Sequence, residues 1–552
     1  MKSSTKWARS SIWIMFVLGL WLVVIWPLGK DFDRMPGGLI DTRYINYVLE
    51  HFFRWLNGLD KSFWSATFFF PYPNVIAFSE NFLGSAPVYS LLRLIGLNRA
   101  SAFQVWYILG YCFNFLSASY VLSKLKFKYL AVGMGAFFFT FGLPILAQEN
   151  HAQLLYRFCV PMACFFLWSF AEEPQLRKLV LLVFWIVWQF YLDIYIGVFL
   201  GLLITSMIFL FSVFESAKSR KGIFIWFVLF KKGWSQARFL EQMTSVVLII
   251  TLGLALTVLL FPYFETEKLY GFSRSLTEIS TMLPRPQSYL MADNSVLWKS
   301  IGNILPNVPM RHEHQLFPGV TASMLLIIGI IGKFPMRSNS KMIWSHLGSV
   351  ILLVMLTLYI NGYSLYKVML FVPGMNSIRA ISRIQLVLMW PIGVFIAYVV
   401  DNLLSIFSNT KFSWATLLLY LMAGCLIAES TFYNHSTFSK ADADARLTLI
   451  RKQLPASQVD TPILLVANQE INQDESQEIE LDAMLVAQDL GWPTLNGYSG
   501  NFPPNFKPIS NCSEATERIT QYMVFARITN QAFYEDMIKH IIPVGLSHCV
   551  LN

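Results

Sequence analysis

Charged residues are scarce in this sequence. Only 14% of its 552 residues are Asp, Glu, Lys or Arg, while 55% are hydrophobic and 16% are aromatic. A single water-soluble core of this size would need more polar residues to cover its surface, so the composition excludes a soluble globular fold. Together with a mean hydropathy of +0.50, it indicates a polytopic membrane protein.

The sequence also lacks the features of a nucleic-acid-binding protein and of a repeat protein. Its formal net charge is +9, yet it contains no basic patch with interleaved aromatic residues. We therefore attribute the positive charge to membrane topology and expect membrane lipids, not nucleic acid, as partners. No internal repeat and no low-complexity tract is found along the sequence.

Cysteine is rare, with six residues, and none of them has the spacing of a zinc site. Only Cys512 and Cys549 lie in the C-terminal part. If that part is outside the cytoplasm, an oxidising compartment permits a disulfide between them, but the sequence leaves this bond open. The other four lie in or beside hydrophobic runs: Cys112, Cys159, Cys164 and Cys425.

Long hydrophobic runs predict about eleven transmembrane helices. The first run, residues 11–28, follows three basic residues and has no small-residue cleavage site, so we expect a retained anchor with a cytoplasmic N-terminus. Runs of roughly 16 to 25 residues are long enough to cross about 30 Å of hydrocarbon. Ten more occur near 100–123, 129–147, 153–171, 177–192, 194–214, 239–263, 318–333, 343–361, 384–401 and 413–429.

Clusters of Lys and Arg fall on alternate connections between these runs, and such connections are usually cytoplasmic. The other connections then lie on the outer side of the membrane. We expect a multi-pass protein of a bacterial inner or plasma membrane. The outer connections include a large first outer loop near 30–99, a long loop near 264–317, and short loops near 147–152 and 362–383.

The composition changes at about residue 431. Residues 431–552 hold 14 acidic and 8 basic residues, a net charge of −6. A strand-like run at 462–467, a helix-like stretch at 481–490 and a strand-like end at 540–550 predict a small α/β unit. We therefore expect a transmembrane domain over 1–430 and a soluble, extracytoplasmic α/β domain over 431–552.

Potentially reactive residues gather in the outer connections. Asp41 lies in a turn soon after the first span, where a carboxylate can accept a proton from a hydroxyl that attacks a sugar carbon. Its structural alternative is a helix N-cap or a turn acid paired with Arg43. Glu149 and His151 place an acid and an imidazole two residues apart at a span end, where they alternatively serve to solvate that end.

Arg379 and Arg383 precede the tenth span and are candidates to bind a lipid phosphate as it leaves. The fork of a guanidinium binds two phosphate oxygens at once, and residues at i and i+4 share one face if the segment is helical. The alternative is that both arginines anchor the span end at lipid headgroups. Residues 496–500, Asn-Gly-Tyr-Ser-Gly, have the composition of a tight turn and are a candidate cover for the acceptor.

Two short patterns are compatible with a metal ion. Asp31 and Asp33 have the DxD spacing of metal-using glycosyltransferases, and residues 312–314 read His-Glu-His. Such short patterns arise often by chance, and loop clusters of this kind are usually solvated. We assign no metal ligand and no cofactor from the sequence, and leave a divalent cation open.

The order of these features resembles the GT-C superfamily of membrane glycosyltransferases. Members begin with one span, then a large outer loop with an essential acid, then a short outer loop with a paired acidic or acid-x-His motif. Asp41 matches the first position, and Glu149-x-His151 resembles the second. Further stretches look like those of largely uncharacterised bacterial members: 64–81, 316–319, 373–380 and 493–500.

The resemblance implies a polyprenyl-phosphate-linked sugar donor, bound between the first outer loop and the membrane, and inversion at the anomeric carbon. Asp41 would deprotonate the acceptor, Glu149 and His151 would assist it, and Arg379 with Arg383 would stabilise the departing phosphate. Because no Trp-Trp-Asp motif of oligosaccharyltransferases is present, we expect a lipid or surface-polysaccharide acceptor.

Two other classes remain open: a transporter or flippase, and a non-enzymatic envelope assembly protein. Transporters typically have repeated spans and ionisable residues near the bilayer midplane. Here the charges lie at the outer boundary and repeats are absent, which favours the enzyme.

Overall fold

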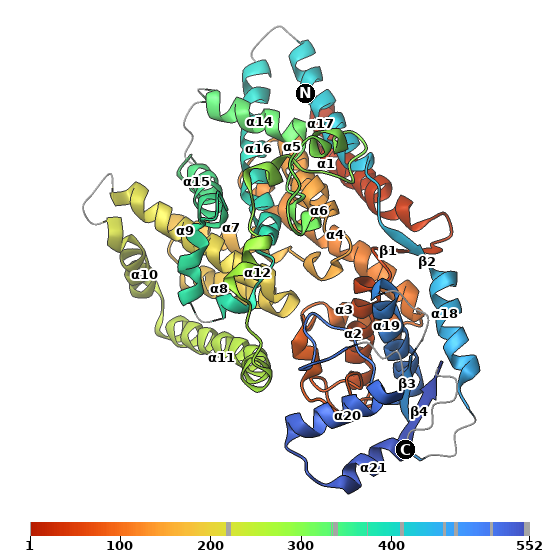
Figure 1. The fold of residues 1–552 in the computed structure, drawn as a ribbon. Helices are drawn as coiled ribbons and strands as arrows, with labels where there is room; N and C mark the ends of the chain where they lie inside the picture. Colours follow the sequence, from red (N-terminus) through yellow and green to blue (C-terminus); the bar gives the residue numbers. More distant parts are fainter. Residues whose placement is uncertain are drawn as a thin grey trace.

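The computed structural model describes residues 2–216, 222–332, 334, 340–372, 374–408, 413–455, 460–467, 473–507 and 512–545. Each of the eleven predicted hydrophobic runs is helical over most of its described residues (Figure 1). Eight helical segments within the described residues are long and apolar enough to cross a membrane. They are 10–28, 99–124, 129–146, 152–172, 194–216, 239–270, 381–407 and 414–431.

The remaining three predicted spans are shorter helices. α14 (Val320–Ile331) and α15 (Ser340–Thr357) contain the shorter apolar segments, and α8 (Leu176–Leu192) has 17 residues. The protein is therefore a multi-pass, mainly helical membrane protein. Its other long helices are α1 (Lys2–Gly19), α4 (Arg99–Lys124), α5 (Tyr129–Phe141), α7 (Cys159–Glu172), α9 (Ile194–Ser216), α11 (Phe239–Tyr270), α16 (Gln385–Ser408) and α17 (Ser413–Thr431).

α5 and α16 form the centre of the helical part (Figure 1). The most apolar stretch of α16 is completely buried, and that of α5 with α6 (Leu143–Leu146) is 94% buried. Gly135 on α5 faces Gly393 on α16, and a Cβ on Gly135 would lie 2.6 Å from the carbonyl oxygen of Gly393. Small residues let membrane helices approach closely. α11, in contrast, is only 11% buried and presents an apolar surface suited to lipid.

The connection near 30–99, which is predicted to be an outer loop, carries two α-helices, α2 (Asp41–Leu56) and α3 (Ala86–Leu94), and the strand β1 (Arg34–Pro36). β1 pairs antiparallel with β2 (Thr437–Ser439), which follows the last predicted span. Short helical segments form much of the remaining connections. They include η3 (Val75–Phe78), η4 (Ala152–Leu154), α10 (Ile225–Gln236), α12 (Leu276–Thr281), α13 (Lys299–Asn303), η7 (Arg311–His314), η8 (Leu365–Phe371), η9 (Met375–Ser377) and η10 (Ile381–Ile384).

Besides β2, the described residues of the C-terminal part form two parallel strands and four α-helices. β3 (Ile463–Val466) pairs with β4 (Ile541–Val544), with Ile463 opposite Ile541. The helices are α18 (Lys440–Gln453), α19 (Gln473–Leu490), α20 (Cys512–Ala526) and α21 (Gln531–His540). A small α/β unit is thus present only in outline, and Cys549 of the candidate disulfide lies outside the described residues.

This C-terminal part packs against the connection near 30–99 (Figure 1). The backbone N–H groups of Phe69 and Phe70 donate to the carbonyls of Asn496 and Thr494, each at 2.9 Å. Arg43 on α2 forms a buried ion pair with Asp482 on α19. Residues more than 400 positions apart therefore meet beside the N-terminus of α2, where Asp41 lies.

Candidate functional site

Asp41 is the first residue of α2, and its carboxylate contacts two side chains from distant segments. His151 Nδ1 lies 3.0 Å from Asp41 Oδ2, and the Tyr498 hydroxyl donates to Asp41 Oδ1 at 2.6 Å. The helix N-terminus adds a favourable partial positive charge. The Asp41 side chain remains 29% exposed, so a substrate hydroxyl can reach it.

His151 continues the network to a second carboxylate. Its Nε2 lies 3.6 Å from Glu313 Oε1, and Glu313 receives two hydrogen bonds from Arg383, at 3.1 and 2.5 Å. Gln148 Nε2 also donates to Glu313 Oε2, at 3.4 Å. The order along the network is Tyr498, Asp41, His151, Glu313 and Arg383, so one imidazole lies between two carboxylates.

The electrostatics keep both carboxylates ionised at neutral pH. Burial alone would raise the pKa of Asp41, but His151, the Tyr498 hydroxyl and the charge of Arg383 hold it below its usual value. Burial acts on Glu313 in the same direction, yet Arg383 and His151 lower its pKa to about 2. Asp41 is the accessible member of the pair, because Glu313 has a side chain only 2% exposed.

Glu149 faces away from Asp41, although His151 is only two residues further on. One carboxylate oxygen lies 2.9 Å from His435 Nδ1, and the other accepts the backbone N–H of Ser436. Glu149 thus holds the segment that leads from α17 to β2. The acid and the imidazole of the Glu149-x-His151 motif point to different partners, because a short turn separates them.

Arg379 and Arg383 do not share a helical face, since Arg379 precedes the short segment η10 and Arg383 lies within it. Both adjoin Tyr195: the guanidinium of Arg383 lies 5.6 Å from its ring centre, and Arg379 N donates to its hydroxyl at 3.4 Å. Arg379 Nη1 lies 3.7 Å from Glu278, with 40% of its side chain exposed. Arg379 is therefore the more accessible cation.

The side chains of the His-Glu-His segment, residues 312–314, do not share one set of partners. His314 Nδ1 lies 2.7 Å from the Ser288 hydroxyl and Nε2 lies 2.9 Å from the Thr281 carbonyl oxygen, while Glu313 belongs to the network around His151. Within the described ranges, no group of three or more His, Cys, Asp or Glu residues has a metal-binding arrangement.

Two members of the network were not identified as site residues from the sequence. In the sequence, Glu313 belongs only to the His-Glu-His pattern at 312–314, and Tyr498 only to the predicted tight turn at 496–500. The segment that bears Tyr498 packs closely against Phe69. This packing requires glycine at position 497, because a Cβ there would overlap the ring of Phe69. The resemblance of 493–500 to other sequences was the available signal for Tyr498.

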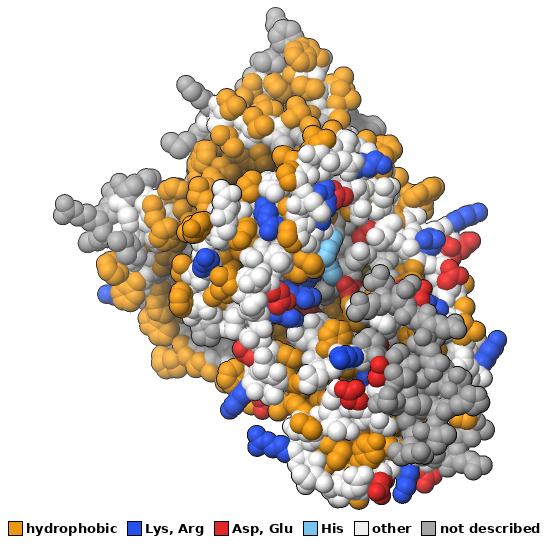
Figure 2. All heavy atoms as spheres, viewed as in Figure 1, with side chains coloured by type: hydrophobic (Ala, Val, Ile, Leu, Met, Phe, Trp, Pro, Cys, Tyr) orange, Lys and Arg blue, Asp and Glu red, His pale blue; other side chains and the backbone are white. Residues whose placement is uncertain are grey.

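Charged side chains gather around a histidine in the middle of the face shown in Figure 2, and hydrophobic side chains cover much of the adjoining surface. The fold and the site thus define a multi-pass helical membrane protein with an ionised, histidine-linked acid centre at the ends of its helices.

No protein-family model and no curated protein matches this chain. Solved structures that are similar to it include two membrane proteins. One is the archaeal oligosaccharyltransferase AglB from Archaeoglobus fulgidus, in complex with an inhibitory peptide and a dolichol-phosphate, with 12% identity and a TM-score of 0.48. The similarity covers 89% of this chain, which spans 64% of the length of AglB.

Another similar structure is ArnT from Cupriavidus metallidurans, bound to undecaprenyl phosphate. It has 10% identity and a TM-score of 0.42, and the similarity covers 89% of this chain and 85% of ArnT.

Proposed function

We propose that this protein is an inverting, GT-C-type membrane glycosyltransferase. It moves a sugar from a polyprenyl-phosphate carrier to a hydroxyl of a lipid or surface polysaccharide, on the outer face of a bacterial inner membrane. The observation that carries the proposal is the partly exposed, ionised Asp41 held by His151 and Tyr498 at the end of a network that includes Arg383.

Asp41 acts as the base in the proposed step. Its Oδ1 accepts the Tyr498 hydroxyl, and an acceptor hydroxyl that takes the place of Tyr498 would donate its proton to the same oxygen. Losing the Tyr498 hydrogen bond also makes Asp41 more basic, which favours proton transfer. His151 holds the Asp41 carboxylate in place through Oδ2. The buried pair of Glu313 and Arg383 in turn holds His151 in position.

The leaving phosphate requires a cation that is not already neutralised. Arg383 is taken by two hydrogen bonds to Glu313, whereas Arg379 is 3.7 Å from its nearest carboxylate partner and partly exposed. We therefore assign phosphate contact to Arg379 and a positioning role to Arg383. Direct displacement of the phosphate by the activated hydroxyl inverts the anomeric carbon.

The test is mass-spectrometric profiling of lipids and surface polysaccharides from cells that lack the protein. The deletion is complemented with wild type, Asp41→Asn or Asp31→Asn, the last being an exposed acid of the same loop. We expect a glycan that disappears on deletion and returns with wild type and Asp31→Asn only. Full restoration by Asp41→Asn would contradict the proposed base, and an unchanged glycan profile on deletion would favour transport or assembly.

A further inference from the structure

The 3₁₀ segment η8 (Leu365–Phe371) exposes three large hydrophobic side chains. Leu365 is 62% exposed, Val368 is 64% exposed and Phe371 is 88% exposed. A 3₁₀ helix has three residues per turn, so side chains three positions apart lie on one face. These three residues therefore form an apolar stripe, which the described part of the chain leaves uncovered.

A tight turn just before η8 adds two more exposed side chains. The backbones of Ile360 and Tyr363 exchange two hydrogen bonds, each of 2.9 Å. Asn361 and Gly362, between them, both have positive φ, at 47° and 88°, as in the favoured two-residue hairpin turns. Because Ile360 and Tyr363 are exposed, the turn presents an aliphatic and an aromatic side chain ahead of the apolar stripe.

The apolar stripe continues the exposed face of α15, the predicted span that precedes it. Trp344, Ile351 and Met355 are exposed on α15, and their spacing of seven and four residues places them on one helical face. α15 and η8 are in contact. Lipid tails are as apolar as these side chains and suit such a face of a spanning helix. The apolar stripe therefore lies where a lipid-covered surface ends.

The other side of η8 packs toward the candidate site. Tyr366 is completely buried and lies close to Tyr195. Tyr195 contacts both arginines of the site, because its hydroxyl accepts the backbone N–H of Arg379 and its ring lies 5.6 Å from the guanidinium of Arg383. The position of η8 is therefore linked to the positions of the two arginines.

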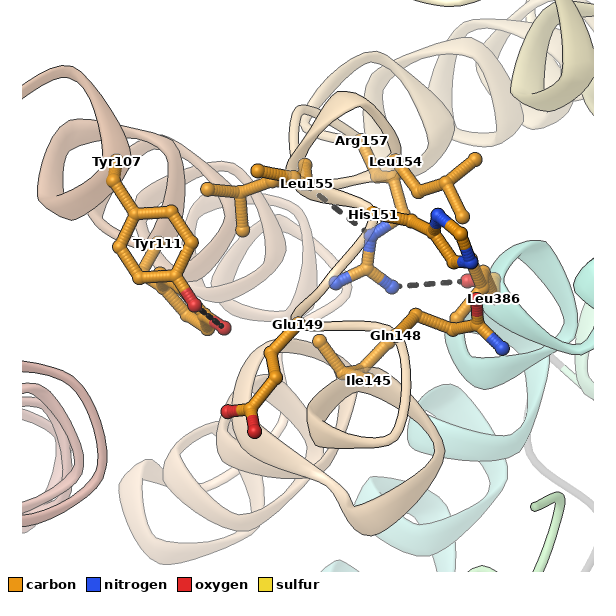
Figure 3. A pocket seen from close by; sticks show the side chains of 11 residues that line it. Tyr107, Tyr111, Ile145, Gln148, Glu149, His151, Leu154, Leu155, Arg157 and Leu386 are labelled. Atoms are coloured by element: carbon orange, nitrogen blue, oxygen red, sulfur yellow. Dashed lines mark hydrogen bonds between the residues drawn. The ribbon is translucent and has the colours of Figure 1, made fainter. Parts of the chain in front are cut away.

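The exposed cations of this region suit a membrane surface. Lys367 is exposed, and its ammonium lies 5.7 Å from the ring centre of Tyr363. Tyrosine and lysine are both favoured where hydrocarbon meets water. Arg379 is also partly exposed, whereas Arg157 is fully buried and faces the small cavity shown in Figure 3. Lys367 and Arg379 are therefore accessible to lipid phosphates, and Arg157 is not.

From these contacts we propose that the turn at 360–363 and η8 insert into the surface of the lipid bilayer. The apolar stripe lies among the acyl chains, and the Lys367 ammonium lies at the lipid phosphates. Exposed apolar patches mark protein or membrane contacts, and continuity with α15 and the flanking cation favour the membrane. This insertion holds Arg379 at the level of the headgroups. The proposal does not depend on glycosyl transfer.

The experiment is photo-crosslinking of the full-length protein in vesicles of phosphatidylethanolamine and phosphatidylglycerol. The photoreactive residue p-benzoylphenylalanine replaces Leu365, and adducts are identified by mass spectrometry after irradiation. We expect a phospholipid adduct at this position. The matched control is the same replacement at Leu449 on α18, a leucine with 61% exposure on a highly charged helix of the C-terminal part. There the phospholipid adduct should be lost.

A second labelled position guards against a disturbed fold. Phe371 is already aromatic and highly exposed, so the photoreactive residue fits there with little change, and it should also give a phospholipid adduct. Adducts at Ile351 of α15 but at neither position of η8 would overturn the proposal. A covalent dimer in place of the lipid adduct would overturn it in favour of a contact between copies of the chain. Equal lipid yields at Leu365 and Leu449 would also overturn it.

Discussion

The two carboxylates on either side of His151, Asp41 and Glu313, differ in their exposure and in their partners. Asp41 is 29% exposed and accepts a hydrogen bond from Tyr498 that a substrate can replace, while Glu313 is almost completely buried and bound by Arg383. An accessible carboxylate can exchange a proton with substrate, whereas a buried, paired one holds its neighbours in place. In the proposed mechanism, Asp41 is therefore the base and Glu313 a positioning residue.

The variant Tyr498→Phe tests whether the Tyr498 hydroxyl lowers the pKa of Asp41. The change removes a hydrogen bond that lowers the pKa of Asp41, so this pKa should rise. Since a base must be ionised to act, the acid limb of the pH–rate profile should move to higher pH. We expect a change of only a few-fold in the maximal rate, because the carboxylate remains. An acid limb that stays in place would show that Asp41 is not the group that titrates in the profile.

Glu313→Gln should be strongly destabilising, because it leaves the buried Arg383 charge without its partner. Breaking a buried pair from one side costs about 3–5 kcal/mol, and the double variant Glu313→Gln/Arg383→Met should recover part of this loss. The measurement is chemical unfolding in detergent. Equal stability of the single variant and the wild type would contradict the assigned ion pair.

The same pair gives stability a pH dependence. The pKa of Glu313 falls from its ordinary 4.5 to about 2 in the folded protein. Its contribution to stability is therefore fully present above about pH 4.5 and is lost as the pH falls towards 2. Glu313→Gln should lose this part of the acid dependence.

Single residues were only partly predictable from the sequence. Asp41 and His151 stood out because an acid and an imidazole near span ends are rare in an apolar chain, and the structure brings them together. Tyr498 is 457 positions from Asp41, and no local pattern encodes such a contact. The pairing of Glu149 with His435 could not be predicted from the sequence either, because it depends on how β1 and β2 join distant segments.

At the scale of elements, hydrophobic runs predicted the helices well. All eleven runs are helical because a backbone in hydrocarbon must satisfy its own hydrogen bonds. Packing between helices was not predictable from run length. The approach of Gly135 on α5 to Gly393 on α16 depends on their facing positions. The segment around Arg379 and Arg383 is irregular with a short 3₁₀ turn, so the expected common face does not form.

Gly135→Ala tests the central helix contact. The new methyl group would lie 2.6 Å from the Gly393 carbonyl oxygen, so α5 and α16 must separate. We expect a loss on the order of 2 kcal/mol from overpacking, seen as a lower melting temperature. Gly253→Ala on α11 is the matched control, because nothing lies within 4 Å of its added Cβ. Equal effects of the two variants would show that the contact is not tight.

At the scale of the whole molecule, the C-terminal part completes a candidate site that begins in the connection near 30–99. Its composition predicted a separate α/β unit over 431–552, and the two parallel strands fit that outline. The sequence could not show that α19 packs on α2 or that Tyr498 reaches Asp41. The site therefore depends on the docking of segments from both ends of the chain.

Asp482→Asn should loosen this docking. Asp482 on α19 neutralises the buried Arg43 of α2, and we expect a loss of about 3 kcal/mol when that charge loses its partner. Limited proteolysis of the full chain should then cut the C-terminal part faster. Asp489→Asn on the same helix removes a carboxylate with 39% exposure and should leave the rate nearly unchanged. Similar cleavage rates for wild type and Asp482→Asn would argue against this docking contact.

The most direct test of the central claim is sugar transfer by the purified protein in lipid nanodiscs. The substrates are polyprenyl-phosphate sugars and lipid acceptors extracted from cells that lack the protein, and the readout is release of the free carrier phosphate by mass spectrometry. We expect release with wild type and Asp31→Asn, and a rate lower by about 10²–10⁴-fold with Asp41→Asn, the usual contribution of a general base. An Asp41→Asn protein that releases the carrier at the wild-type rate would contradict the account.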